Sequence, residues 1–192
     1  MLETRRKALM AALEDGDPQV RIAAAASLEA LEPLLHLQQL LGGLAVADRG
    51  HRIHCLFALE KVRAPGVPEA LLRLLEDPDP DVRAAAVQVL GARAEARALP
   101  ELAKRLRDPE AAVRMYAAEV LGAFRDARLV PYLAAVLRDE DSGVVAAAAT
   151  SLGSIGAAES EKYLLALLRD SRAPVRRAAA VALGRLEIKD EP

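Results

Sequence analysis

The sequence predicts an all-α solenoid made of six helix-hairpin repeats. One column of valine recurs every 31 residues along the 192-residue chain, with histidine in the second copy. Its members are Val20, His51, Val82, Val113, Val144 and Val175. Three other columns hold leucine in all six copies. A fixed period of this length is typical of repeat proteins in which each unit packs on its neighbours.

The leucine columns mark the faces that the repeats are expected to bury. The first is Leu9, Leu40, Leu71, Leu102, Leu133 and Leu164, and the second is Leu13, Leu44, Leu75, Leu106, Leu137 and Leu168. The third follows the valine column by eight residues and is Leu28, Leu59, Leu90, Leu121, Leu152 and Leu183. Leucines at helical spacing predict amphipathic helices that lean on the next copy.

The first helix of a copy is clearest in the third. Leu71, Leu72 and Leu75 form one apolar helical face. The Asp-Pro-Asp-Pro segment 77–80 should end this helix, because proline lacks an amide proton and disfavours helical geometry just before it.

The second helix should begin at an acidic N-cap and end at glycine. The acidic column is Asp17, Asp48, Asp79, Glu110 and Asp141, with Arg172 in the last copy. The glycine column is Gly91, Gly122, Gly153 and Gly184, where we expect left-handed C-caps. Gly42 and Gly43 lie inside the first helix of copy 2, so we expect that helix to be frayed, kinked or mobile.

The repeat predicts a single domain over residues 1–192 without an internal boundary. The expected repeats are 2–32, 33–63, 64–94, 95–125, 126–156 and 157–188.

Composition narrows the classes of function. The net charge is −2 and both signs are interspersed, which argues against nucleic acid as a partner. One cysteine excludes a disulfide framework and favours a cytoplasmic protein. The sequence contains no apolar run long enough for a membrane span and no apolar segment after its N-terminus, so we expect neither a membrane span nor a signal peptide.

Three segments carry a family resemblance. Residues 77–91, 108–122 and 171–184 resemble the HEAT-like repeat of phycobilin lyase subunits and many bacterial proteins. The resemblance implies a right-handed superhelix with the first helices on the convex side and the second helices lining the concave side. The Ala, Arg and Leu content also resembles that of bacterial proteins from GC-rich genomes.

The resemblance further implies an Asp–Arg ladder that links adjacent repeats. The acids are Asp15, Asp77, Asp108, Asp139 and Asp170, and the bases are Arg21, Arg52, Arg83, Arg114 and Arg176. The alternative is an arginine row that binds anions. Val46 replaces the acid in copy 2 and Val145 replaces the base in copy 5, so these two junctions are expected to be less firmly tied.

No constellation of residues predicts catalysis, a cofactor or a metal. His51, His54 and Cys55 have the spacing of ligands on one helical side. The alternative places His51 and Cys55 in core columns, which leaves His54 alone. Metal-binding relatives of the deoxyhypusine hydroxylase type carry His-Glu pairs, and this chain has no His-Glu dipeptide.

The second helices carry apolar residues where their open face should be polar. Taking about 100° per residue, the positions two, three and six after the valine column lie opposite the core. Their bulky members in copies 2 and 4 predict a trough that binds a partner. The predicted partner-binding residues are Ile22, Ile53, His54, Phe57, Gln88, Met115, Tyr116 and Glu119. The alternatives are packing against neighbouring helices or a small apolar ligand.

The predicted function is therefore a non-catalytic scaffold or adaptor that binds a helix or extended segment of another protein on its concave face. The alternative is a subunit resembling the phycobilin lyases, in which His54 and Tyr116 contact a tetrapyrrole. A third, less favoured hypothesis is nucleic-acid binding.

Overall fold

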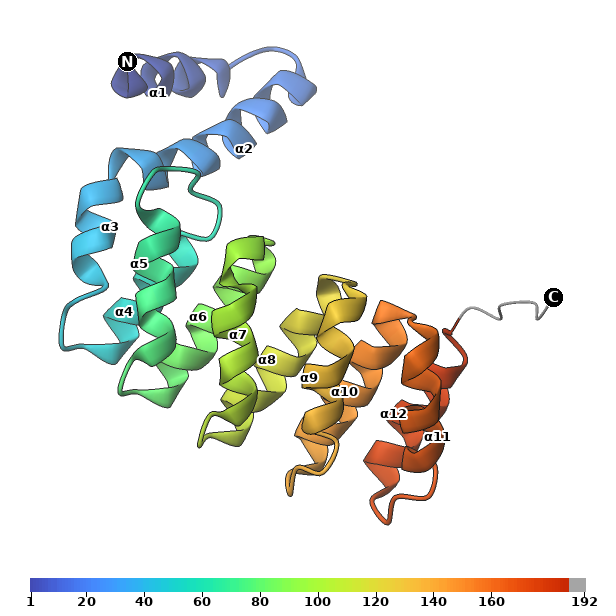
Figure 1. The fold of residues 1–192 in the computed structure, drawn as a ribbon. Coiled ribbons are helices and arrows are strands. Elements are labelled where there is room, and N and C mark those ends of the chain that lie inside the picture. Colours follow the sequence, from blue (N-terminus) through green and yellow to red (C-terminus); the bar gives the residue numbers. More distant parts are fainter. Residues whose placement is uncertain (187–192) are drawn as a thin grey trace. The chain divides into compact units, whose positions relative to one another are not determined.

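The computed structural model describes residues 1–186, and its regular structure over that range is entirely helical (Figure 1). The α-helices are α1 (Leu2–Ala12), α2 (Pro18–Leu35), α3 (Leu37–Gly43), α4 (Arg49–Ala58), α5 (Val67–Arg73), α6 (Pro80–Ala92), α7 (Leu99–Lys104), α8 (Ala111–Ala123), α9 (Val130–Ala135), α10 (Ser142–Ile155), α11 (Glu161–Leu167) and α12 (Ala173–Leu183). Short 3-10 helices cover Leu74–Glu76, Ala96–Ala98, Arg105–Arg107, Ala127–Leu129 and Ala158–Ser160. The predicted all-α solenoid is confirmed.

The described chain forms a first compact unit, Met1–Leu71, and a second that begins at Leu72. The single domain over 1–192 and its six repeat boundaries stay predictions. The last two residues of the last predicted repeat, 157–188, lie outside the described residues.

In the second unit, the odd-numbered helices begin the hairpins and are called A helices here, and the even-numbered helices are called B helices. The B helices α6, α8, α10 and α12 pack in sequence order, each against the next. Val82, Val113, Val144 and Val175 are fully buried between them, as the valine column predicts. Burying a side chain of this size contributes about 1.5–3 kcal/mol. Ser151 adds a buried hydrogen bond from its hydroxyl to the carbonyl of Ala118, 2.9 Å long.

The first unit packs less completely around the same columns. Val20, the first member of the valine column, is 40% exposed, while Leu56 of α4 and Leu59, its C-cap residue, are fully buried. Helix α2 continues to Leu35, beyond the predicted end of the first repeat, and His36 separates it from α3. The predicted first helix of copy 2 is therefore interrupted near its start.

The prediction of left-handed glycine C-caps is wrong. Gly91, Gly122 and Gly153 lie inside α6, α8 and α10. A Cβ at Gly91 would meet the Val120 side chain at 2.5 Å, and one at Gly153 would meet the Ala182 Cα at 2.7 Å. A Cβ at Gly122 would meet Ser151. Glycine is present because adjacent B helices approach closely at this position.

The left-handed residue comes three positions later. The residues at that position are Ala94, Arg125 and Gly156, with φ values of 49°, 51° and 71°. They are again 31 residues apart. Only the third is glycine, although glycine adopts this conformation at the least cost.

Gly43 has a packing role that the sequence interpretation did not identify. A Cβ at Gly43 would lie 2.5 Å from the Cys55 Sγ and 2.8 Å from the His51 Nε2. Helix α3 therefore packs directly on α4 at this glycine, and Gly43 is buried. By contrast, a Cβ at Gly42 would meet nothing within 4 Å.

Most of the predicted acidic N-caps are confirmed. The carboxylates of Asp17, Asp48, Asp79 and Asp141 accept hydrogen bonds from amides in the first turn of α2, α4, α6 and α10. Glu110 is the exception, because its side chain makes no cap hydrogen bond to α8. The longer glutamate side chain suits this short-range bond less well than aspartate.

The Asp–Arg ladder forms in the second unit. Arg83 donates from Nε and Nη2 to both carboxylate oxygens of Asp108, at 2.9 and 2.8 Å. Its Nη1 donates to the carbonyls of Asp77 and Pro78 in its own turn. Arg114 repeats the arrangement with Asp139 at 2.7 and 2.9 Å. One guanidinium thus joins the turn of its own repeat to the turn of the next.

The ladder shifts the pKa values of its carboxyl groups. Burial of Asp108 by itself raises the pKa, but hydrogen bonds from Arg83 and from the Glu110 amide outweigh it, so the pKa lies below its ordinary value. The hydrogen bonds from Arg114 likewise lower the pKa of Asp139. Ionised carboxylates therefore hold these junctions together.

The junction between copies 5 and 6 is tied, contrary to expectation. Arg172 of copy 6 donates from Nη1 to the carbonyls of Asp139 and Glu140, at 2.9 and 3.3 Å. Its Nε and Nη2 donate to the carboxylate of Asp170, both at 2.9 Å. These are the groups that an arginine at position 145 would bond, so Arg172 occupies the place that Val145 leaves empty.

Candidate functional site

The B helices of the second unit border a groove on their open side. It is lined by α8, α10 and α12 and has a volume of about 670 Å³. Ala146, Ala147 and Ala178 are among its lining residues, with Thr150 and Val181 exposed beside them. These residues stand two, three and six positions after the valine column. The face that the helical wheel assigns to the open side therefore does line a groove in this unit.

The groove carries opposite charges on its outer helices. Glu119 contributes a carboxylate from α8, while Arg177 contributes a guanidinium from α12. Arg185, just after α12, lies on the same rim. Packing around Glu119 removes part of its hydration and raises the pKa of its carboxyl group. A partner segment with a cation near α8 and an anion near α12 would match this arrangement.

Four of the predicted partner-binding residues lie in the second unit. Glu119 is exposed and lines the groove, whereas Gln88, Met115 and Tyr116 are half-buried. A Cβ at Gly143 would lie 3.5 Å from the Met115 Sδ, so this thioether packs against the start of α10. Met115 therefore helps to join α8 to α10.

The other four predicted residues lie in the first unit. Ile22 is 62% exposed on α2 and Phe57 is 45% exposed on α4. Ile53 is half-buried and His54 is exposed. The trough that would join these residues to those of copy 4 stays a prediction.

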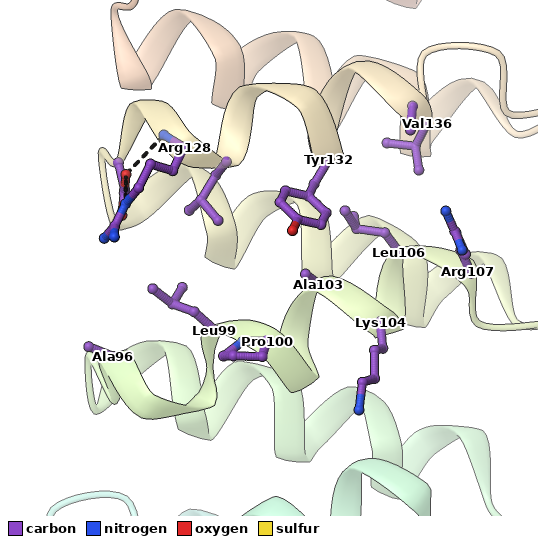
Figure 2. Close-up of a pocket in the computed structure, with 13 residues that line it drawn as sticks. Ala96, Leu99, Pro100, Ala103, Lys104, Leu106, Arg107, Arg128, Tyr132 and Val136 are labelled. Carbon is purple, nitrogen blue, oxygen red and sulfur yellow. Dashed lines mark hydrogen bonds and ion pairs between the residues drawn. The ribbon is translucent and has the colours of Figure 1, made fainter.

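A second groove, which the sequence interpretation missed, lies between the A helices α7 and α9. Its volume is about 730 Å³, and Figure 2 shows Tyr132 of α9 reaching over it toward α7. The signal was a substitution in one column. Ala103, which lines the groove, stands where copies 3 and 6 carry Leu72 and Leu165.

His51, His54 and Cys55, whose spacing was considered for metal ligands, lie on α4. Cys55 is buried, and burial raises the pKa of its thiol. The rings of His51 and His54 have centroids 6.4 Å apart. Within residues 1–186, no three His, Cys, Asp or Glu side chains are placed to share a metal ion.

Helix length and polarity bear on the membrane question. Among the helices that the structure describes, none combines the length and the apolar character that crossing a bilayer requires.

Comparison with known families identifies the repeat. A model of HEAT repeats matches residues 37–113 and 99–184, which together cover more than half of the chain. The chain belongs to the HEAT repeat family. A comparison with curated proteins finds no match.

Several solved structures share the HEAT-type fold. The complex of CpcE and CpcF of phycocyanin lyase from Nostoc sp. PCC7120 is 25% identical with a TM-score of 0.67. The alignment covers 78% of this chain and 64% of that one. This chain thus corresponds to less than two thirds of the lyase chain.

Two further structures extend over nearly the whole HEAT repeat chain. Human deoxyhypusine hydroxylase is 24% identical, with a TM-score of 0.57 and coverage of 96% of this chain and 74% of that one. A designed armadillo repeat protein in complex with the peptide (KR)4 is 18% identical, with a TM-score of 0.58 and coverage of 97% and 99%. These likenesses establish the fold, which scaffolds and enzymes share.

Proposed function

We propose that this protein is a non-catalytic scaffold whose B-helix face binds a helix or extended segment of a partner protein. The observation that carries the proposal is the groove over α8, α10 and α12, because it is formed by the face that the repeat leaves uncovered. An alanine floor lets a segment approach the backbone of the helices closely. Glu119 and Arg177 then fix its direction by charge.

Two kinds of observation support a protein as the ligand. The phycocyanin lyase structure is itself a complex of two protein chains, and the designed armadillo protein holds a peptide. On the first unit, the exposed side chains of Ile22 and Phe57 give B helices apolar contact points of their own. Aromatic side chains such as that of Phe57 are enriched in the cores of protein interfaces.

The test of this function places a large side chain in the groove. Thr150 is exposed at the centre of α10, so Thr150→Arg should leave the fold intact and block the groove. Proteins captured from a lysate of the source organism are identified by mass spectrometry, and thermal unfolding is followed in parallel. Ala166→Arg, on the exposed side of α11 and outside this groove, is the matched control.

We expect Thr150→Arg to lose the captured proteins while Ala166→Arg retains them. Equal capture by both variants would contradict binding at this face. A large drop in the melting temperature of Thr150→Arg would show instead that the residue supports the fold.

The likeness to phycocyanin lyase supports a second candidate function, in which the protein handles a tetrapyrrole. Mixing the protein with a bilin and recording its absorbance tests the idea. The absence of both a spectral shift and transfer to an acceptor protein would rule this hypothesis out.

A further inference from the structure

The groove between α7 and α9 lies on the A helices, and the proposed function makes no use of it. Both helices border it along their length, from Ala96 and Arg128 at one end to Arg107 and Val136 at the other (Figure 2). It therefore follows the helix direction instead of forming a round cavity.

The lining of this A-helix groove is mainly apolar. Leu106, Leu129 and Val136 form a buried floor. Leu99 rises on the α7 side and Tyr132, 54% exposed, rises on the α9 side. A large aromatic side chain at the edge of an apolar floor is typical of the anchoring point of a protein interface.

Cations outnumber anions around the apolar floor. The lining residues include Lys104, Arg107 and Arg128 but a single acid, Asp126. Asp126 is engaged by Arg128 at 2.6 Å, and Lys104 contacts Glu101 at 2.7 Å. Within the described part of the chain, Arg107 has no ion-pair partner. This local excess of positive charge contrasts with the net charge of −2 of the whole chain.

We propose that this A-helix groove is a second docking site, which takes an acidic amphipathic segment of a partner protein. Apolar side chains of the segment lie on the floor between Leu99 and Tyr132, and a carboxylate pairs with Arg107. The Tyr132 hydroxyl remains available for a hydrogen bond at the rim.

The shape of the groove favours a protein segment over a small molecule. Small-ligand sites usually enclose most of the ligand surface, whereas this groove leaves one side open along the helices. An amphipathic helix needs cover on its apolar face only, and its charged face stays in water. The occupant is therefore recognised by an apolar stripe flanked by glutamate or aspartate.

The experiment uses a synthetic peptide of about 12 residues, which matches the length of an A helix with its flanking turns. It carries leucine and one tryptophan on one helical face and glutamate on the other. Because the chain has no tryptophan, the fluorescence of the peptide can be followed selectively. A matched peptide has lysine in place of each glutamate. Titration of the full chain gives the two dissociation constants.

We expect a blue shift of the tryptophan emission with the acidic peptide and at least about tenfold weaker binding of the lysine peptide. Arg107→Glu should weaken the acidic peptide by roughly three- to tenfold and strengthen the lysine peptide. Ala135→Gln, which fills the exposed edge of the groove, should weaken both. Thr150→Arg on the B-helix face should change neither.

Three outcomes would overturn the proposal. Equal affinity for the two peptides would remove the charge argument. Loss of binding in Thr150→Arg but not in Ala135→Gln would place the peptide on the B-helix face. Sedimentation that shows a dimer of the chain alone, dissociated by Ala135→Gln, would assign the groove to a second copy. Failure of the B-helix proposal leaves these results unaffected, since the two faces share no lining residue.

Discussion

Two junctions of the solenoid each lack one member of the Asp–Arg ladder, and among the described residues only one of them has a side chain that replaces the missing member. Between copies 5 and 6 the arginine is missing at Val145, and Arg172 supplies a guanidinium from the other side. Between copies 1 and 2 the acid is missing at Val46, and Arg21 donates only to carbonyls of its own turn within the described residues. A guanidinium between two turns can therefore come from either repeat, as Arg172 shows, and Arg21 makes no such bridge between copies 1 and 2 among the described residues.

The two junctions also differ in how closely their B helices approach. Gly153 of α10 packs directly against Ala182 of α12. The same column holds Glu29 in copy 1, whose carboxylate lies 3.7 Å from Lys61 at the surface. The junction between copies 1 and 2 thus lacks both the aspartate of the ladder, at Val46, and the glycine of the close helix contact, at Glu29.

The largest effect is expected where the ladder is complete and buried. Arg83→Ala leaves the carboxylate of Asp108, which is almost fully buried, without its bidentate partner. Breaking a buried pair in this way costs about 3–5 kcal/mol of the free energy of unfolding. Urea denaturation followed by circular dichroism measures it. A loss below about 1 kcal/mol would show that the ladder is not a principal tie.

The close approach of α10 and α12 is tested by a pair of glycine substitutions. Gly153→Ala should destabilise the protein by about 1–3 kcal/mol, because its Cβ would meet the backbone of Ala182. Gly184→Ala, whose Cβ meets only its own helix, should be neutral or stabilise by up to about 1 kcal/mol. Similar urea midpoints for the two variants would contradict the packing role of the column.

The role of Arg172 as the substitute for an arginine at position 145 is tested by removing Arg172 and placing an arginine at position 145. Arg172→Ala should lower the melting temperature, and Val145→Arg should recover most of the loss in that variant, since it returns the guanidinium to its usual position. Val145→Arg alone should destabilise, because two guanidinium groups would compete for the same acceptors. Differential scanning calorimetry of the four proteins gives the coupling. Additive shifts would mean that the two positions are independent.

Acid should weaken the same junction. The hydrogen bonds from Arg172 lower the pKa of Asp170 from 3.8 to about 2. A carboxyl with a lowered folded-state pKa stabilises the fold above its unfolded pKa, and this contribution is lost as the pH falls from about 4 to about 2. Thermal unfolding at a series of pH values should show a smaller acid effect in Arg172→Ala than in the parent. Identical pH profiles would contradict this account.

The smallest effect is expected from completing the first junction. Val46→Asp offers Arg21 the missing carboxylate and should stabilise the fold by up to about 1 kcal/mol, the range of a partly exposed ion pair. Val46→Asn provides a control of the same shape without charge. A gain that survives in high salt would point to a cause other than the ion pair.

Short-range spacing predicted much of this fold. The helix hairpins and four of the five acidic caps follow from residues within one period, since caps and turns depend on neighbours in sequence. The ladder was expected from the resemblance to HEAT-like repeats. The role of the glycine column was misjudged, because glycine serves both a left-handed turn and a close helix contact. The sequence alone does not distinguish the two at Gly91.

The candidate sites were predicted less completely. Glu119 was placed on the open face by helical periodicity, and it does line the B-helix groove. The groove at Tyr132 was missed because it depends on the space between two A helices, which a helical wheel does not describe. Arg172 was taken for a defect in the cap column, since its partners at Asp139 and Glu140 lie 33 and 32 residues away.

The position of Arg172 also has a consequence for how such chains change by duplication. Copy 5 lacks its own arginine and copy 6 supplies a replacement, so the turn of copy 5 depends on copy 6 for its donor. An ordinary repeat inserted between them would leave the carbonyls of Asp139 and Glu140 without their donor. We therefore expect the fold to tolerate an inserted repeat at the joints before copy 5 more readily than at the joint after it.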